Sequence, residues 1–175
     1  MFVWGSTLPL NLFSIIIFGL RIVCHQSQCR CCSLTFYNCG NDAIDFSGST
    51  VKVSNASMRK IGDKAVSVGE RASVSISKSS INFAEIGLTC KDGSILNVDN
   101  ADFKNTKIGL CAFIKKPEYG PAVVIANNIK GIENTEIPFL IEEGSKITYD
   151  SVHISPTEKN VKSILYGNEY GKSSK

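Results

Sequence analysis

Two aspartates, Asp42 and Asp45, stand three residues apart near the start of the regular part of the chain. Carboxylates held at a set separation hydrolyse glycosidic bonds, one acting as acid and the other as base or nucleophile. The chain has no Asp-Asp pair, however, and its two histidines, His25 and His153, lie outside the regular region. We therefore assign no catalytic residue. The two aspartates remain ligand-binding candidates, and the alternative is that they cap turns.

A second group of polar side chains lies in an insertion at residues 113–121, which contains two prolines that stiffen it. Insertions between repeats run over the surface and often carry function. Lys115, Lys116 and Glu118 could meet the polar groups of a ligand, and Tyr119 offers a flat amphipathic ring. These four residues join the two aspartates as candidates for ligand binding. The alternative is a surface turn without a function.

Cysteines give no basis for a metal site or a cofactor. Four of the seven crowd near the N-terminus, at Cys24, Cys29, Cys31 and Cys32. Their spacing matches no common zinc pattern. Farther along, Cys39 and Cys90 fall at inward-facing positions, whereas Cys111 falls at an outward-facing one. We predict small core fillers at the first two and no disulfide between Cys90 and Cys111.

The candidate residues sit within a sequence that repeats at intervals near twenty-two residues, in copies at 42–47, 64–69, 86–90, 108–112 and 137–141. Each copy has apolar residues two apart, which is the period of a strand with one buried face. A turn, a second alternating pair, a polar run rich in Ser and Asn, and a third apolar position follow. We expect this third position to form one column, made of Phe36, Met58, Ile81, Phe103 and Ile129.

Three short strands and three turns per repeat indicate an all-β fold: a single-stranded solenoid, or parallel β-helix, of about five rungs over residues 34–154. A leucine-rich repeat is the main competitor, but the copies are rich in Val, Ile and Ser rather than Leu. The outward column next to the apolar ones should contain Asp45, Ser67, Thr89, Cys111 and Leu140. The last interval is twenty-nine residues because of the insertion at 113–121.

Residues 1–33 differ sharply in composition from the rest, and residues 2–20 carry no charge. That length can cross a membrane. A cleaved signal peptide and lipoprotein attachment at Cys24 both lack support, because no basic residue precedes the apolar run and Arg21 lies close before Cys24. Two interpretations remain open: a membrane anchor, or a segment that is foreign to the fold or wrongly joined to it.

Residues 155–175 should form a C-terminal cap and tail. Val161, Ile164, Leu165 and Tyr166 have helical spacing, and Ser155 or Thr157 would cap the helix. We expect this helix to cover the open end of the rod, as repeat arrays require for solubility. Residues 171–175 should be a frayed tail.

The charge pattern argues against nucleic acid as a partner. The net charge is +3, yet residues 34–154 contain thirteen Lys or Arg and fourteen Asp or Glu. No basic stripe is present to neutralise phosphates. The oligomeric state stays open, and a membrane contact is expected only through residues 2–20.

The chain resembles the right-handed parallel β-helix family with the pectin-lyase-like fold. The turn and strand Asn41-Asp42-Ala43-Ile44-Asp45 look like a motif of that family, which includes polygalacturonases. The stretches 91–94, 116–120 and 165–172 are similar to the C-terminal β-helix region of large bacterial and archaeal proteins that carry a spore-coat-kinase-like domain. The first resemblance implies right-handed coiling. The second implies that the chain is the last piece of a longer parent.

These observations favour a non-catalytic scaffold or a polysaccharide-binding element, extracellular or at the cell surface. The alternative is a carbohydrate-active enzyme, either a polysaccharide lyase or a glycoside hydrolase of the pectin-lyase-like fold. The Gly-His-Gly and Arg-x-Lys motifs of polygalacturonases are absent. A flat polar surface of Ser67, Thr89, Lys52, Ser75 and Asn97 would suit weak contacts with sugars.

Overall fold

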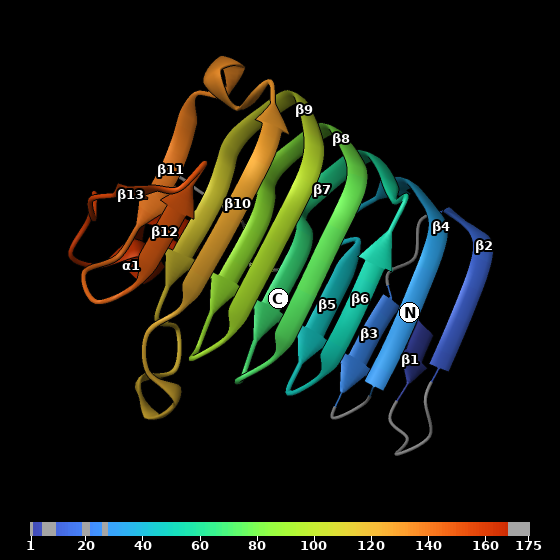
Figure 1. Cartoon of the computed structure of the whole chain (residues 1–175), viewed down its shortest axis with the longest axis horizontal. Helices are drawn as coiled ribbons and strands as arrows, with labels where there is room; N and C mark the ends of the chain where they lie inside the picture. Colours follow the sequence, from blue (N-terminus) through green and yellow to red (C-terminus); the bar gives the residue numbers. More distant parts are fainter. Residues whose placement is uncertain (1, 5–9, 19–21, 26–27, 168–175) are drawn as a thin grey trace.

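The computed structural model describes residues 2–4, 10–18, 22–25 and 28–167, with side chains from residue 28 onward except that of Cys29. The chain winds into a parallel β-solenoid of about five turns, which confirms the predicted fold class. Its strands lie side by side along the length of the molecule, and the N-terminal strands are at one end (Figure 1).

Thirteen strands make up most of the described chain. They are β1 (Phe2–Trp4), β2 (Leu10–Phe18), β3 (Ile22–His25), β4 (Gln28–Cys39), β5 (Ile44–Ser47), β6 (Thr50–Ser54), β7 (Ser57–Gly69), β8 (Ser73–Lys91), β9 (Ile95–Phe113), β10 (Val123–Lys130), β11 (Ile137–Ile141), β12 (Lys146–Tyr149) and β13 (Val152–Ile154). Three short helices complete the described chain: η1 (Pro117–Tyr119), η2 (Ile132–Asn134) and α1 (Val161–Tyr166).

Three flat faces make up the wall of the solenoid. Face A consists of β5, β11 and the last parts of β7, β8 and β9. Face B consists of β6, β12 and the first parts of β4, β8, β9 and β10. Face C consists of the last parts of β4 and β10, the first part of β7 and the middle parts of β8 and β9.

The interior is filled by columns of apolar side chains that stack from rung to rung, as strand spacing requires. Val66, Leu88 and Leu110 form one such column and are fully buried. The predicted third column is correct for Phe36, Met58, Ile81 and Phe103, which are paired in register.

Ile129 does not continue that column, and its predicted place was wrong: it pairs with Ala101. The chain leaves the ladder just after it, because Gly131 (φ 75°) starts the turn into η2. A Cβ on Gly131 would lie 2.1 Å from the backbone oxygen of Phe103, so the turn passes close over the rung below. Ile132 of η2 is buried and joins the core.

Two ladders of left-handed residues let a long strand bend from one face to the next. Asn55, Lys78, Asn100 and Asn128 lie between faces B and C, with φ between 51° and 58°. Asn38, Lys60, Phe83 and Asn105 lie between faces C and A, with φ between 49° and 60°. Asparagine tolerates this conformation better than most residues. The polar runs of the repeat therefore mark corners.

Strands from the N-terminal region extend the same ladder. β2 pairs in parallel with β4, and β3 pairs in parallel with β5. β4 itself runs through residue 33 without a break. The boundary predicted at residue 33 therefore does not coincide with a break in strand pairing. The role of residues 1–33 as an anchor or a foreign segment stays a prediction.

The C-terminal segment ends the solenoid in two ways. β13 pairs with β12 in the antiparallel direction, which closes the parallel ladder on face B. Helix α1 lies on the outer surface of face A, and its Val161 and Leu165 pack with Ile108, Cys111 and Leu140. The expectation that the helix would cover the open end was wrong. The outward column of face A becomes apolar in the last rungs, and the helix buries these apolar side chains instead.

The predicted helix cap was also wrong. Asn160 is the N-cap, and its side chain accepts a hydrogen bond from the backbone N–H of Ser163. Thr157 instead bonds both the N–H and the carbonyl of Ile141, and so ties the segment to β11. The predicted tail, 171–175, lies outside the described residues.

Glycine substitutions test the close approach of η2 to the rung below. Gly131→Ala should lower the free energy of unfolding by about 3 kcal/mol, because the residue has positive φ and its Cβ would meet backbone. Gly120→Ala is the matched control, since Gly120 also has positive φ but its Cβ would meet nothing within 4 Å. It should cost about 1 kcal/mol. Equal losses in urea unfolding would contradict this packing.

Candidate functional site

Face A positions the first candidate, Asp45, on the outside of β5. Asp45 pairs with Ser67 of β7, Ser67 with Thr89 of β8, and Thr89 with Cys111 of β9. Ser67, Thr89 and Cys111 are fully buried, whereas Asp45 is partly exposed. The flat polar surface predicted from the sequence is therefore wrong, since Ser67 and Thr89 are covered and lie on a different face from Lys52, Ser75 and Asn97.

Asp42 is held inside the structure by the next rung. Its carboxylate accepts a hydrogen bond from the backbone N–H of Lys64 and lies 3.5 Å from the Lys64 ammonium. The Lys64 side chain is 5% exposed and makes a closer contact, 2.5 Å, with Asp63. Asp42 thus performs the capping role of the simpler interpretation, and it is nearly inaccessible to a ligand.

Burial and charge act in opposite directions on this buried group. Burial raises the pKa of Asp42, the ammonium of Lys64 only partly offsets this, and the carboxylate of Asp63 raises the pKa further. Burial lowers the pKa of Lys64, but the carboxylates of Asp42 and Asp63 outweigh that effect and raise it overall. Lys64 therefore stays protonated next to its carboxylate partners.

A hollow of about 160 Å³ opens where face A turns toward face B, and we call it the corner hollow. It brings together three of the predicted residues, Asp45, Lys115 and Lys116. The other lining residues are Phe46, Ser47, Gly69, Glu70, Lys91 and Asp92. The lining therefore includes three lysines and three acidic residues, taken from four successive turns of the chain.

Asp92 anchors the inserted loop to the corner hollow. One carboxylate oxygen accepts hydrogen bonds from the backbone N–H groups of Lys115 (2.7 Å) and Lys116 (2.6 Å). The other oxygen, Oδ2, is buried without a hydrogen-bond partner. Buried polar atoms are rarely left unpaired. Asp92, which lines the corner hollow, therefore holds the loop with one oxygen and keeps the other as a buried acceptor without a partner.

The three lysines of the corner hollow differ in their contacts. Lys91 donates a hydrogen bond to the Ser67 hydroxyl at 2.5 Å. Lys116 forms an ion pair with Glu70, whose carboxylate also accepts a hydrogen bond from Ser47. The Lys115 ammonium instead lies 4.4 Å from the centre of the Tyr166 ring.

Burial lowers the pKa of Lys115, and the neighbouring ammonium groups of Lys91 and Lys64 lower it further. Asp92 and Asp45 oppose this shift without cancelling it. An anionic group placed in the corner hollow would relieve the repulsion among these cations. Lys115 would therefore be stabilised in its charged form by an anionic ligand.

The remaining predicted residues lie beside the corner hollow and do not line it. Glu118 and Tyr119 are on η1. The Tyr119 ring contacts two cations, Arg71 at 5.6 Å and Lys116 at 5.8 Å from its centre. Gly93 passes directly beneath, since a Cβ there would lie 2.3 Å from the Tyr119 carbonyl. Tyr119 is thus packed against the loop and the preceding turn.

The sequence analysis missed Glu70, Lys91, Asp92 and Tyr166. The repeat contains a signal for the first three, because the register places Ser47 beside Gly69 and Cys90 beside Ala112, so the following turns must also stack. Tyr166 has no such signal. It reaches Lys115 only because α1 packs on face A, which the helix pattern does not specify.

Comparisons with models of protein families, with curated proteins and with solved structures found no match for this chain. Within the described ranges, no helix has the length and apolar character needed to cross a membrane. No cluster of three or more His, Cys, Asp or Glu side chains suitable for a metal ion occurs among those residues either. Cys90 and Cys111 form no disulfide with each other, as predicted.

Removal of the Asp92 carboxylate tests the anchoring of the loop. Asp92→Ala should lower the free energy of unfolding by about 2–3 kcal/mol, because two backbone N–H groups lose their acceptor. Asp102→Ala is the control: it removes a carboxylate from an exposed ion pair with Lys104 and should cost under about 1 kcal/mol. A smaller loss for Asp92→Ala than for the control would contradict the anchoring role.

Proposed function

We propose that this chain is a non-catalytic β-helix module that binds a polysaccharide at the corner hollow, as a scaffold or binding element outside the cell or on its surface. The observation that carries the proposal is the mixture of donors and acceptors there. Three lysines and three acidic residues line the same small space. Sugar hydroxyls both donate and accept hydrogen bonds, so they match such a mixture.

The size of the corner hollow favours a polymer over an isolated small ligand. Pockets that enclose small molecules usually measure about 300–1,000 Å³. The corner hollow is smaller, about 160 Å³. It can hold only part of a ligand, so the remainder would lie along the surface of the solenoid. A polysaccharide satisfies this requirement with successive sugar units.

The roles of the carboxylates support binding without catalysis. A glycoside hydrolase of the usual kind needs two carboxyl groups free to act on the same bond. Asp92 already holds two backbone N–H groups, and Glu70 is engaged by Lys116 and Ser47. Asp45 is next to Ser67 along the outward column and not next to another acid. Among the described residues that line the corner hollow, Glu70 and Asp92 are thus engaged elsewhere, and neither is available to act with Asp45 on one bond.

A polysaccharide lyase is the second candidate, and the lowered pKa of Lys115 favours it. A base with a lowered pKa can remove the proton next to the carboxylate of an acidic sugar. The glycosidic C–O bond would break as the C=C bond forms, and the leaving oxygen would take a proton from water. Lys115 would then give the abstracted proton to the hydroxide left in the solvent, which restores its neutral amine beside Asp45 and Asp92.

Loss of the Lys115 charge should weaken binding. We expect Lys115→Met to reduce affinity for an acidic polysaccharide such as polygalacturonate about tenfold, measured by affinity electrophoresis or calorimetry. Lys52→Met on the outside of face B removes the same charge from an exposed position and should leave affinity within about twofold. Equal effects of the two variants would reduce the interaction to general attraction by positive charge.

The pH dependence follows from the direction of the Lys115 shift. Because the pKa of Lys115 is lowered, its charge disappears as pH rises through a value below the ~10.4 of an ordinary lysine. Binding of an anionic sugar should therefore weaken with rising pH earlier in wild type than ordinary lysines would allow. In Lys115→Met this early phase should be missing. An identical pH profile for both proteins would contradict the role of Lys115.

Degradation of the polymer separates the two candidate functions. The binding module should release no product from polygalacturonate, whereas a lyase would release unsaturated fragments that absorb ultraviolet light. Turnover abolished by Lys115→Met and retained by Lys52→Met would replace the binding module with the lyase. Binding with no turnover in either protein is the result that we expect.

A further inference from the structure

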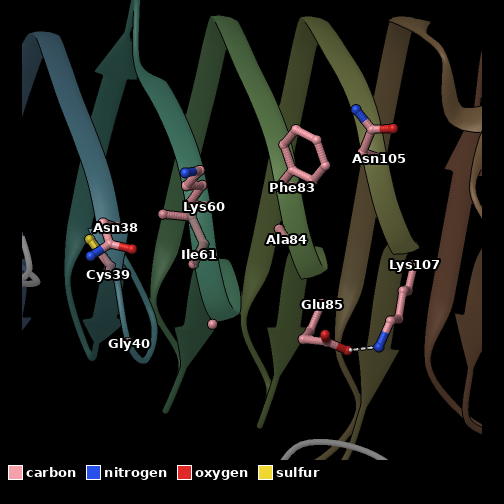
Figure 2. A pocket seen from close by; sticks show the side chains of 11 residues that line it. Asn38, Cys39, Gly40, Lys60, Ile61, Phe83, Ala84, Glu85, Asn105 and Lys107 are labelled. Carbon is pink, nitrogen blue, oxygen red and sulfur yellow. Dashed lines mark hydrogen bonds and ion pairs between the residues drawn. The ribbon is translucent and has the colours of Figure 1, made fainter.

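A larger hollow, about 490 Å³, lies at the corner between faces C and A, and we call it the Phe83 hollow. Figure 2 shows Phe83 projecting beside Lys60 and Asn105, with Ala84 below it. Cys39, Ile61 and Ala84 form an apolar base, and the side chains of Asn38, Asn105 and Lys107 stand around it. It lies at a different corner from the corner hollow and shares no residue with it.

Phe83 has two features that are unfavourable for the stability of the fold. Its φ is 60°, a left-handed conformation that is unfavourable for a bulky side chain. Two of the three other residues at this corner are asparagine, which adopts that conformation most readily after glycine. The Phe83 side chain is also 48% exposed. An aromatic ring that is both strained and exposed is not explained by packing within the chain, which directs attention to a partner.

Two glycines create the space beside the ring. A Cβ on Gly40 would have nothing within 4 Å, so a side chain at this position would extend into open space. Gly62 is different, because a Cβ there would lie 2.6 Å from the Gly40 carbonyl. The close approach of Gly62 to Gly40 lets the two rungs meet, and the missing side chains leave the apolar base uncovered.

The charge around the Phe83 hollow is positive after local ion pairs are counted. Lys107 is paired with Glu85, and Lys104 is paired with Asp102. Among the described residues, no ion pair joins Arg59 or Lys60 to a carboxylate, and the Lys60 ammonium lies 5.4 Å from the centre of the Tyr37 ring. A ligand with negative charge next to its apolar part would therefore complement this corner.

We propose that the Phe83 hollow is a docking site for an acidic polypeptide segment, which inserts one apolar side chain beside Phe83 and places carboxylates near Arg59 and Lys60. The methyl and thiol groups of the base favour an apolar side chain over a sugar ring, whose hydroxyls would lose hydrogen bonds to water there. Aromatic residues in such hollows contribute strongly to protein interfaces. This inference is independent of the proposed polysaccharide site.

The test uses a displayed library of random heptapeptides selected against the full chain. Peptides with an apolar residue flanked by Asp or Glu should be enriched. Gly40→Leu places a side chain in the hollow with a Cβ that meets nothing within 4 Å, and it should weaken their binding at least about tenfold. Lys60→Glu should weaken it about fivefold, and Lys52→Glu on face B should leave it unchanged. The enriched peptide should shift the NMR amide signals of Ile61, Phe83 and Ala84.

Phe83→Asn provides a second measurement that does not depend on the library. It should raise the melting temperature by about 2 °C, because asparagine suits the left-handed corner, and it should abolish peptide binding. A lower melting temperature would assign the ring to the fold and overturn the docking site. So would an absence of enriched peptides, equal binding to wild type and Gly40→Leu, or amide shifts caused only by a neutral oligosaccharide.

Discussion

Stacking of each rung on the next in fixed register is the constraint on which the rest of this structure depends. Asp45 pairs with Ser67, and Val51 pairs with Val74, so that residues twenty-two or twenty-three apart lie side by side. Every backbone bend must then recur in the same place. The left-handed corners and the apolar columns both follow from this repetition, because a change in one rung must be accommodated by its neighbours.

Charged side chains cluster at the inserted loop, where the regular stacking of the rungs is interrupted. The insertion after β9 cannot stack as the other turns do, and Asp92 compensates by bonding its backbone N–H groups. That contact brings Lys115 and Lys116 beside Lys91. Helix α1 then places Tyr166 against Lys115. The corner hollow is therefore a product of one insertion and the turn that anchors it.

The spacing of the sequence repeats predicts much of this arrangement and fails at particular residues. It predicts the rungs, the inward positions of Cys39 and Cys90, and the outward position of Asp45, because each depends on strand alternation alone. It fails for Ile129, where Gly131 ends the ladder early, and for α1. The outward column ends in Cys111 and Leu140, and an apolar surface there accepts a helix whose position depends on packing in three dimensions and not on period.

The most direct test of the account is an NMR titration of the isotopically labelled chain with a short acidic oligosaccharide. The polysaccharide site at the corner hollow predicts saturable shifts in the amide signals of Ser47, Glu70, Asp92 and Lys116, with signals of face B outside the corner hollow unchanged. Saturable shifts confined to another face, or none at concentrations of several millimolar, would contradict the central claim. The solenoid would then stand as a scaffold without a sugar site at this corner.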